Sequence, residues 1–353
     1  MTPSKFPAHR LHTKIYATLL LLVLAFGGAA RAQEQQDEPV ETINSNLVIL
    51  NVGVADRKGQ AVTNLSRGDF AIYEDSARQS IVSFEPTSAP FSLVLLLDMS
   101  GSTLNFRPTL KQSALRFIDA LAPGDRVAVI SFWVKRDKGK SEGKVITLTD
   151  FTDDRRDIAH AISNAEGAGG TNLYEGIRFA LRQLAREGNR RKAVVVLTDG
   201  KDTELETLDR KAAGAANTND EALAAVKPEA NPRLRAVLDT ADRQGVTIYP
   251  LALPSGDIKR IAQPLPQQIA IYAAARARLQ SLADRTGGRL HVINRLEDLG
   301  KLYAEVAAEM RTLYSIAYLS SNTRPRDGSW RAINIEVTRA ELIARSRPGY
   351  YAR

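Results

Sequence analysis

The sequence contains no cysteine among its 353 residues, and this absence excludes several kinds of site. Without thiols the chain cannot form disulfides, thiolate zinc sites or iron–sulfur clusters, and it has no cysteine nucleophile. It also lacks the cysteine on which a bacterial lipid anchor is built. Histidine is sparse, with four residues, so a catalytic triad that depends on imidazole has little to draw on.

Acidic residues are absent from the first 32 positions, where Lys5, Arg10, Lys14 and Arg31 supply positive charge. The whole chain has 48 basic and 40 acidic residues, and without this segment the numbers are 44 and 40, a formal charge of +4. Such a small surplus is a weak field for collecting phosphates. We therefore expect no nucleic acid among the main partners.

The N-terminal segment has the three-part layout of a secretory signal peptide. A basic stretch is followed by an apolar run from Ile15 to Phe26 and by small residues that end in Ala30-Arg31-Ala32. The run is shorter than the ~20 residues that cross a membrane, so we predict a signal peptide over 1–32, with an uncleaved anchor as the alternative. No second apolar run of this length follows. We expect a secreted or periplasmic protein without stable membrane insertion, with residues 33–41 as a disordered leader.

Short β-rich runs separated by turn residues occupy both flanks of the remaining chain. The first set lies in residues 42–90 and the second in residues 311–353, where Asp327-Gly328 is a turn signal. The ends of a domain usually lie close together. We therefore expect the two flanks to form one small β domain, and the alternative is two unrelated β tails.

Residues 91–310 alternate apolar strand-like runs with stretches of helical periodicity. This alternation predicts an α/β fold, a doubly wound and mainly parallel sheet with helices on both faces. The charged residues 135–144 are expected to connect two strands. Residues 202–231 are polar, rich in alanine and free of aromatic side chains, and we predict a flexible insertion there with one short helix.

Oxygen-bearing side chains follow three of the predicted elements. Asp98, Ser100 and Ser102 form a D-x-S-x-S sequence after the first strand, Thr171 lies in a loop before a helix, and Asp199 follows another apolar strand. Ligand sites of open parallel sheets lie beyond the carboxyl ends of the strands. Two carboxylates brought together there repel each other unless a cation lies between them. Carboxylates and hydroxyls suit Mg²⁺, with Mn²⁺ or Ca²⁺ as alternatives.

Each of these motifs also has a plainer interpretation. Ser100 and Ser102 could be helix caps, Thr171 could cap the helix that starts at Leu173, and Gly200 could be only a turn. Their shared position at the ends of strands favours a common site over separate caps.

The three motifs resemble the metal-ion-dependent adhesion site of von Willebrand factor type A domains, the fold shared with integrin inserted domains. The resemblance covers roughly residues 91–310. It implies that one divalent ion is held by Asp98, Ser100, Ser102, Thr171 and Asp199. It also implies an open coordination position that a carboxylate of a partner protein fills.

The flanks are similar to those of a bacterial, chiefly acidobacterial, group of secreted proteins of this type. Gly68-Asp69-Phe70 and Tyr73-Glu74-Asp75 recur in that group, and so does the ending Arg347-Pro348-Gly349-Tyr350-Tyr351. This likeness implies secretion and brings no defined activity with it.

Several enzyme classes share fragments of the sequence but lack a necessary residue. A phosphatase of the haloacid-dehalogenase type needs a second Asp where Ser100 stands, and a pepsin-like protease needs Ser or Thr where Met99 stands. The stretch Gly139-Lys140-Ser141-Glu142-Gly143 matches the serine hydrolase pattern, but no apolar strand leads into it. His160 and His291, which follow the predicted signal peptide, are expected to be ordinary surface or core residues.

We therefore predict a binding module and no enzyme: its bound ion would accept a carboxylate of a partner protein. One alternative is a structural subunit of an envelope assembly, in which the metal stabilises the fold. Another is a metal-dependent hydrolase that uses Asp98, but a single ion without a nearby base is poorly equipped to activate water. The sequence predicts neither the identity of the partner nor an oligomeric state.

Overall fold

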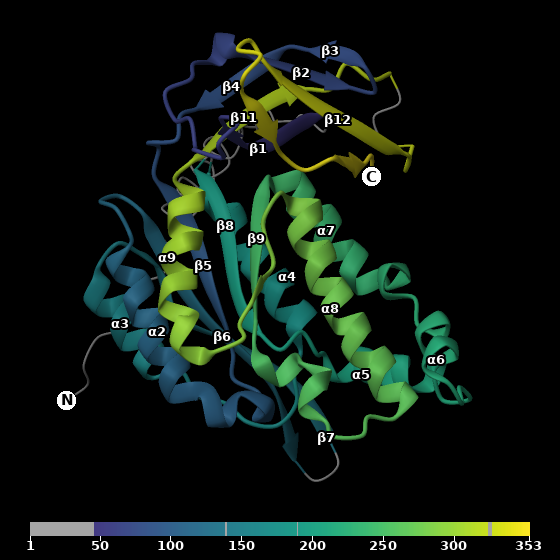
Figure 1. Ribbon diagram of the computed structural model, residues 1–353. Coiled ribbons are helices and arrows are strands. Elements are labelled where there is room, and N and C mark those ends of the chain that lie inside the picture. The colour runs from purple at the N-terminus through teal and green to yellow at the C-terminus, as the bar shows by residue number, and fades with distance from the viewer. Residues whose placement is uncertain (1–45, 138–139, 189, 324–326) are drawn as a thin grey trace, which may run out of the picture. The chain divides into compact units, whose positions relative to one another are not determined.

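The computed structural model describes residues 46–137, 140–188, 190–323 and 327–353. The predicted signal peptide, the predicted leader and the first residues of the 42–90 segment lie outside these ranges. Residues 46–353 form one compact unit, which is shown in Figure 1. No helix within the described ranges is both long and apolar enough to cross a membrane.

A six-stranded sheet lies in the order β10-β9-β8-β5-β6-β7. Five strands are parallel, and β7 pairs with β6 in the antiparallel sense. The strands are β5 (Phe91–Asp98), β6 (Arg126–Asp137), β7 (Lys140–Thr152), β8 (Arg191–Thr198), β9 (Val246–Ala252) and β10 (His291–Val292). This arrangement confirms the predicted fold class, a doubly wound and mainly parallel α/β sheet.

Helices cover both faces of the sheet (Figure 1). One layer contains α2 (Arg107–Asp119), α3 (Arg155–Ser163) and α9 (Leu299–Met310), and the other contains α4 (Leu173–Leu184), α7 (Pro232–Gln244) and α8 (Pro266–Thr286). Successive residues of β5 alternate between the two layers, since Leu95 packs in the first and Leu96 in the second. Burial on both faces explains why this strand is apolar throughout.

Short 3₁₀ helices lie in the loops between these elements. In the described residues they are η1 (Arg67–Asp69), η2 (Gly101–Phe106), η3 (Ala185–Glu187), η4 (Pro228–Ala230), η5 (Pro254–Gly256), η6 (Ile258–Arg260) and η7 (Leu296–Asp298). Three of them, η2, η5 and η6, follow strands β5 and β9 directly and shape the loops beyond the carboxyl ends of those strands.

The charged segments 135–137 and 140–144 form the two arms of a hairpin and do more than connect β6 with β7. Strand pairing continues from Phe132 opposite Val145 to Asp137 opposite Lys140, whereas β5 pairs with β6 no further than Phe132. The hairpin therefore projects past the end of β5 as a two-stranded ribbon. Cross-strand pairs such as Lys135 with Glu142 suit a ribbon that is exposed to water.

The segment 202–231 is a correction to the predicted flexible insertion. It forms two α-helices, α5 (Thr203–Ala212) and α6 (Asn219–Ala225), followed by η4. Asp209 of α5 makes two hydrogen bonds of 2.6 Å with the buried guanidinium of Arg278 in α8. Small side chains complete the contact, with Ala213 and Ala222 packed in one cluster with residues of α8. An ion pair and alanines attach this segment to α8. Because large apolar side chains are few, the composition of the segment does not indicate that it is packed.

The two flanks form two four-stranded sheets, in the orders β13-β1-β11-β4 and β14-β12-β2-β3. Their strands are β1 (Leu47–Ala55), β2 (Phe70–Glu74), β3 (Ala77–Gln79), β4 (Ile81–Glu85), β11 (Leu313–Leu319), β12 (Trp330–Val337), β13 (Ile343–Arg345) and β14 (Gly349–Tyr351). Each sheet mixes both flanks, because β1 pairs with β11 and β2 pairs with β12. The sheets share one apolar core, as the predicted small β domain requires.

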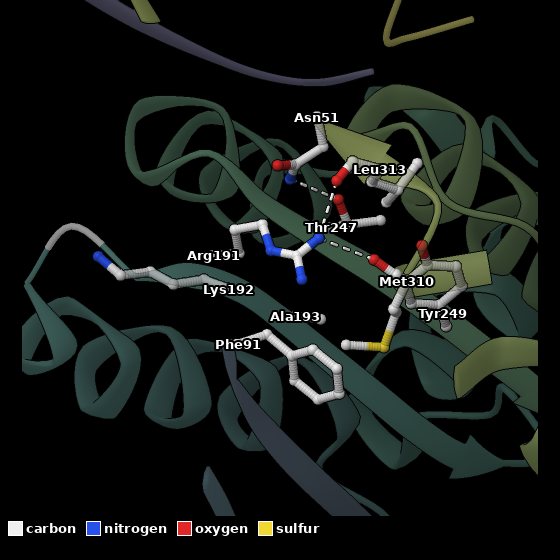
Figure 2. A pocket seen from close by; sticks show the side chains of 9 residues that line it. All are labelled: Asn51, Phe91, Arg191, Lys192, Ala193, Thr247, Tyr249, Met310 and Leu313. Carbon is white, nitrogen blue, oxygen red and sulfur yellow. Dashed lines mark hydrogen bonds between the residues drawn. The ribbon is translucent and has the colours of Figure 1, made fainter. Parts of the chain in front are cut away.

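Buried arginines join this β domain to the α/β domain. Arg191 lies at the amino end of β8, and its guanidinium donates to the carbonyls of Met310 and Leu313 at 3.1 and 2.8 Å and to that of Ala89. Figure 2 shows it beside a cavity of about 10 Å³, room for no more than one water molecule. This cavity, beside the amino ends of β5, β8 and β9, is therefore too small for a ligand.

A second arginine makes a similar connection at α7. Arg347 donates to a carboxylate oxygen of Asp242 at 2.7 Å and to the carbonyl of Ile49 in β1 at 3.1 Å. Asp242 also accepts from Arg285 of α8 at 2.8 Å, and the Arg285 guanidinium lies over the ring of Trp330. These contacts link β1, α7, α8 and β12 into one network.

Candidate functional site

Three loops meet beyond the carboxyl ends of β5 and β8, and backbone hydrogen bonds join them. The N–H of Gly101, after β5, donates to the carbonyl of Gly169 at 2.8 Å. The N–H of Thr203, after β8, donates to the carbonyl of Thr171 at 2.9 Å, and the N–H of Thr171 donates to the Thr203 hydroxyl at 2.8 Å. The structure therefore brings together the segments that carry the five predicted ligand residues.

Asp98 is the last residue of β5 and is fully buried. One carboxylate oxygen accepts from the N–H of Ser100 at 3.0 Å, and the other accepts from the Thr198 hydroxyl at 2.7 Å. Thr198 directly precedes Asp199, but no sequence motif marks it as part of a site. Its hydroxyl also accepts from the N–H of Gly200 at 3.1 Å and thereby connects the loops after β5 and β8.

Two electrostatic effects disfavour the ionised form of Asp98. Burial raises the pKa of Asp98 to about 7, and repulsion from Asp199 adds to the rise, against the hydrogen bonds that Ser100 and Thr198 supply. Burial and a like charge both disfavour the ionised carboxylate. A cation bound between the two carboxylates would stabilise the ionised form of Asp98 and offset both effects.

The side chains of Ser100 and Thr171 do not cap the helices that follow them. Ser100 is nearly fully buried, and its Oγ lies 3.1 Å from the Oγ of Ser102. Ser100 precedes η2 without a side-chain capping bond, and the residue that precedes α4 is Asn172, also without one. The capping role that the sequence allowed for Ser100 and Thr171 is therefore not used, and the Thr171 side chain is buried beside Thr203.

Asp199 is held by its own loop and by a lysine. Its carboxylate accepts from the N–H of Lys201 at 3.1 Å, and its other oxygen lies 3.3 Å from the Lys201 ammonium and 3.5 Å from the Ser255 hydroxyl. Gly200 has a φ of +84°, a left-handed conformation that favours glycine. Gly256 passes so close that a Cβ would lie 2.3 Å from the carbonyl oxygen of Asp199.

Lys201 adds a positive charge to the site, and it was not among the predicted site residues. Burial lowers the pKa of Lys201, but attraction to Asp199 and the contact with Tyr272 outweigh it and raise the value overall. Its Nζ lies 5.0 Å from the centre of the Tyr272 ring. The only sign of it in the sequence is its position two residues after Asp199.

The donor set suits a hard cation. Within the described ranges, no three His, Asp or Glu side chains lie together in a way that could hold a metal ion by themselves. An ion here would depend on the carboxylates of Asp98 and Asp199, on hydroxyls and on water. Oxygen ligands with few carboxylates are typical of Mg²⁺, whereas Zn²⁺ prefers nitrogen and sulfur.

The two histidines of the described chain stand apart from this site. His160 is exposed on α3, and its ring contacts Asn164. His291 lies on β10, two strands away from β8 in the sheet order, and is buried. Neither has a contact with Asp98 or Asp199 among the hydrogen bonds of the described residues, so neither is positioned as a base for a reaction at the carboxylates.

Residues 93–201 match the sequence profile of the von Willebrand factor type A domain. The matched stretch runs from β5 to the loop after β8. It contains all five predicted ligand residues. The profile covers less than a third of the chain, and the flanking β domain lies outside it.

Two curated relatives match parts of the chain. An uncharacterized protein of Synechocystis is 32% identical over 114 residues, which cover 31% of this chain and 25% of that protein. Protein NorD of Brucella suis is 28% identical over 167 residues, which cover 43% of this chain and 26% of that protein. The chain thus spans about a quarter of the length of these relatives.

Solved structures with a similar arrangement are more distant in sequence. An aerotolerance-related membrane protein of Bacteroides fragilis is 15% identical, with a TM-score of 0.42, 62% of this chain and 98% of that chain covered. A von Willebrand factor type A protein of Catenulispora acidiphila is 13% identical, with a TM-score of 0.42, 88% of this chain and 74% of that chain covered. At these TM-scores the likenesses say nothing about function.

Proposed function

We propose that this protein, through its von Willebrand factor type A domain, is a secreted or periplasmic recognition module whose bound divalent ion accepts a carboxylate of a partner protein. The observation that carries the proposal is the pair of buried carboxylates, Asp98 and Asp199, at the carboxyl edge of the sheet. Such a pair favours a cation between its members. Domains of this type commonly mediate protein interaction or adhesion.

Five residues would hold the ion: Asp98, Ser100, Ser102, Thr171 and Asp199. Their oxygens favour Mg²⁺, with Mn²⁺ or Ca²⁺ as alternatives. The ion would supply a Lewis-acidic position at which an anionic group of the partner binds. The chain itself would fix the two carboxylates, through Thr198 and the N–H groups of Ser100 and Lys201.

Recognition fits the site better than catalysis does. A hydrolase would need a group near the ion that takes a proton from water, and the histidines of the described chain lie elsewhere. The neighbours of the two carboxylates are hydroxyls, backbone N–H groups and a lysine. We therefore propose no enzymatic activity for the site. Export rests on the predicted signal peptide over residues 1–32.

Calorimetric titration of Mg²⁺ and Mn²⁺ into the metal-stripped protein tests the proposal. We expect saturable binding at one site, and loss of that binding in the double variant Asp98→Ala, Asp199→Ala. The exposed Asp119 of α2 provides a matched control, since Asp119→Ala should bind as the wild type does. Absence of metal binding by the well-folded wild type would overturn the proposal.

Thr171→Ala separates recognition from a purely structural role of the metal. If the ion serves recognition, the metal-dependent capture of partners falls while the melting temperature changes by no more than a few degrees. If the ion serves the fold, the metal-stripped wild type is already unfolded, and Thr171→Ala lowers the melting temperature along with metal affinity. The second result would replace the proposed module by a structural subunit.

A further inference from the structure

Lys201 places a positive charge of the chain beside one of the two carboxylates proposed to hold the ion. Its ammonium nitrogen lies 3.3 Å from an Asp199 oxygen. The Asp199 side chain is fully buried, and that of Lys201 is 19% exposed. Water screens so buried a pair only weakly, so the ammonium offsets much of the negative charge at Asp199.

The same ammonium has a second partner on α8. Its Nζ lies 5.0 Å from the centre of the Tyr272 ring and 3.5 Å from the Tyr272 hydroxyl oxygen. An aromatic face and a hydroxyl oxygen both attract an ammonium. The Lys201 ammonium can therefore interact with Tyr272 when its attraction to Asp199 is lost, and it need not become fully hydrated.

Asp98 has no comparable counter-ion among its described contacts. Its two oxygens accept from the neutral donors Ser100 and Thr198. Arg107 donates to the carbonyls of Met99 and Ser100 and makes no hydrogen bond with the carboxylate, although its charge also attracts Asp98. The ion pair of the site therefore lies on one side, between Lys201 and Asp199.

We infer that Lys201 is an internal competitor of the divalent ion: its ammonium neutralises Asp199 in the metal-free protein and moves toward Tyr272 when the ion binds. The inference rests on the proposed function, because it assumes that Asp98 and Asp199 hold the ion. It assigns to Lys201 the role of weakening metal affinity while it keeps the empty site stable. Its physical basis is the repulsion between an ammonium and a divalent cation that share one carboxylate.

Two substitutions of opposite expected effect test this role. Lys201→Met keeps the length of the side chain and removes its charge, so Mg²⁺ should bind about tenfold more tightly. Tyr272→Leu removes the second partner of the ammonium, so Mg²⁺ should bind severalfold more weakly. Lys201→Arg keeps the charge and should leave Mg²⁺ affinity within a fewfold of the wild type.

Lys192→Met is the matched control for charge removal. Lys192 lies near the amino end of β8, the end opposite to the site, where its charge interacts with Glu187. Its loss should leave Mg²⁺ affinity unchanged. Melting temperatures without metal provide a second readout: Lys201→Met should melt at a lower temperature than the wild type in chelator, and should gain more than the wild type on addition of Mg²⁺.

The outcomes distinguish this inference from the proposed function. Tighter binding by Lys201→Met than by a wild type that itself binds Mg²⁺ supports the inference. Equal or weaker binding by Lys201→Met, with a wild type that binds Mg²⁺, overturns the inference and leaves the metal site intact. Absence of binding by both proteins, each folded, overturns the inference together with the metal site.

Discussion

Asp98 makes the stability of the metal-free protein depend on pH. Its pKa is about 7 in the folded protein because it is buried and faces Asp199, whereas an aspartate of the unfolded chain has a pKa of about 3.9. Between these values the folded state keeps a proton that the unfolded state has lost. The free energy of unfolding therefore decreases as the pH rises from about 4 to 7, by at most ~4 kcal/mol from this residue.

Asp98→Asn should remove this decrease, because the amide stays neutral at every pH. In chelator, we expect the variant to be more stable than the wild type at pH 8 and close to it at pH 4.5. Urea denaturation at both pH values measures the effect, with the exposed Asp119→Asn as control. A variant that is less stable than the wild type by the same amount at both pH values would contradict the assignment.

At the scale of single residues, the sequence predicts the position of the site better than its contacts. The carboxylates of Asp98 and Asp199 follow apolar strands, and the rule that ligands bind at the carboxyl ends of strands is sufficient to place them. Thr198 and Lys201 could not be assigned in this way. Their roles depend on the direction that a side chain takes at the end of β8, which apolar periodicity does not reveal.

A buried ion pair joins α5, the first helix of residues 202–231, to α8. Asp209 and Arg278 are both buried and are joined by two hydrogen bonds of 2.6 Å. Asp209→Ala would leave the Arg278 guanidinium buried without its partner, and we expect a loss of about 3 to 5 kcal/mol in the free energy of unfolding. Urea denaturation measures this loss, and limited proteolysis should show new cleavage within α5 and α6.

A double variant separates the ion pair from the packing around it. In Asp209→Leu, Arg278→Met both charges are absent, so most of the lost stability should return. The exposed pair of Arg210 with Glu206 on the same helix is the control, since Glu206→Ala should cost less than about 1 kcal/mol. Equal losses for Asp209→Ala and the double variant would show that packing, and not charge, is decisive.

At the scale of elements, strong apolar periodicity was a reliable guide and polar composition was not. β5 and β8 are continuous apolar runs, and the structure has them as central strands. Residues 135–137 and 140–144 carry charges of both signs, yet they extend two strands, because the two strands of a ribbon bond their backbones to each other. Polar residues 202–231 are helical because α8 supplies alanines and Arg278 to pack against.

The two tryptophans of the chain report on different domains. Trp133 packs partly buried against the core of the α/β domain, and Trp330 lies on β12 beside Arg285. Arg191 and Arg347 tie these domains together by buried hydrogen bonds. We therefore expect the single-tryptophan variants Trp133→Phe and Trp330→Phe to give the same urea midpoint by fluorescence.

Arg347→Ala in each single-tryptophan background should separate the two transitions. The substitution removes the bonds to Asp242 and Ile49 and should cost ~3 kcal/mol, with the Trp330 signal changing at lower urea than the Trp133 signal. Arg353→Ala, which breaks a partly exposed pair with Asp239, is the control and should leave the transitions together. Coincident transitions in Arg347→Ala would mean that other contacts couple the domains.

Because each sheet of the β domain contains strands of both flanks, the β domain cannot fold until the C-terminal flank has been synthesised. β1 ends at Ala55, and its partner β11 begins at Leu313. Ribosomes add ~5 to 20 residues per second, so roughly 10 to 50 s separate the two strands. Over that interval β1 and β2 have open edges, which are prone to pair with other chains. A chain interrupted before Leu313 would keep those edges permanently, so prematurely terminated products should aggregate even when the α/β domain has folded.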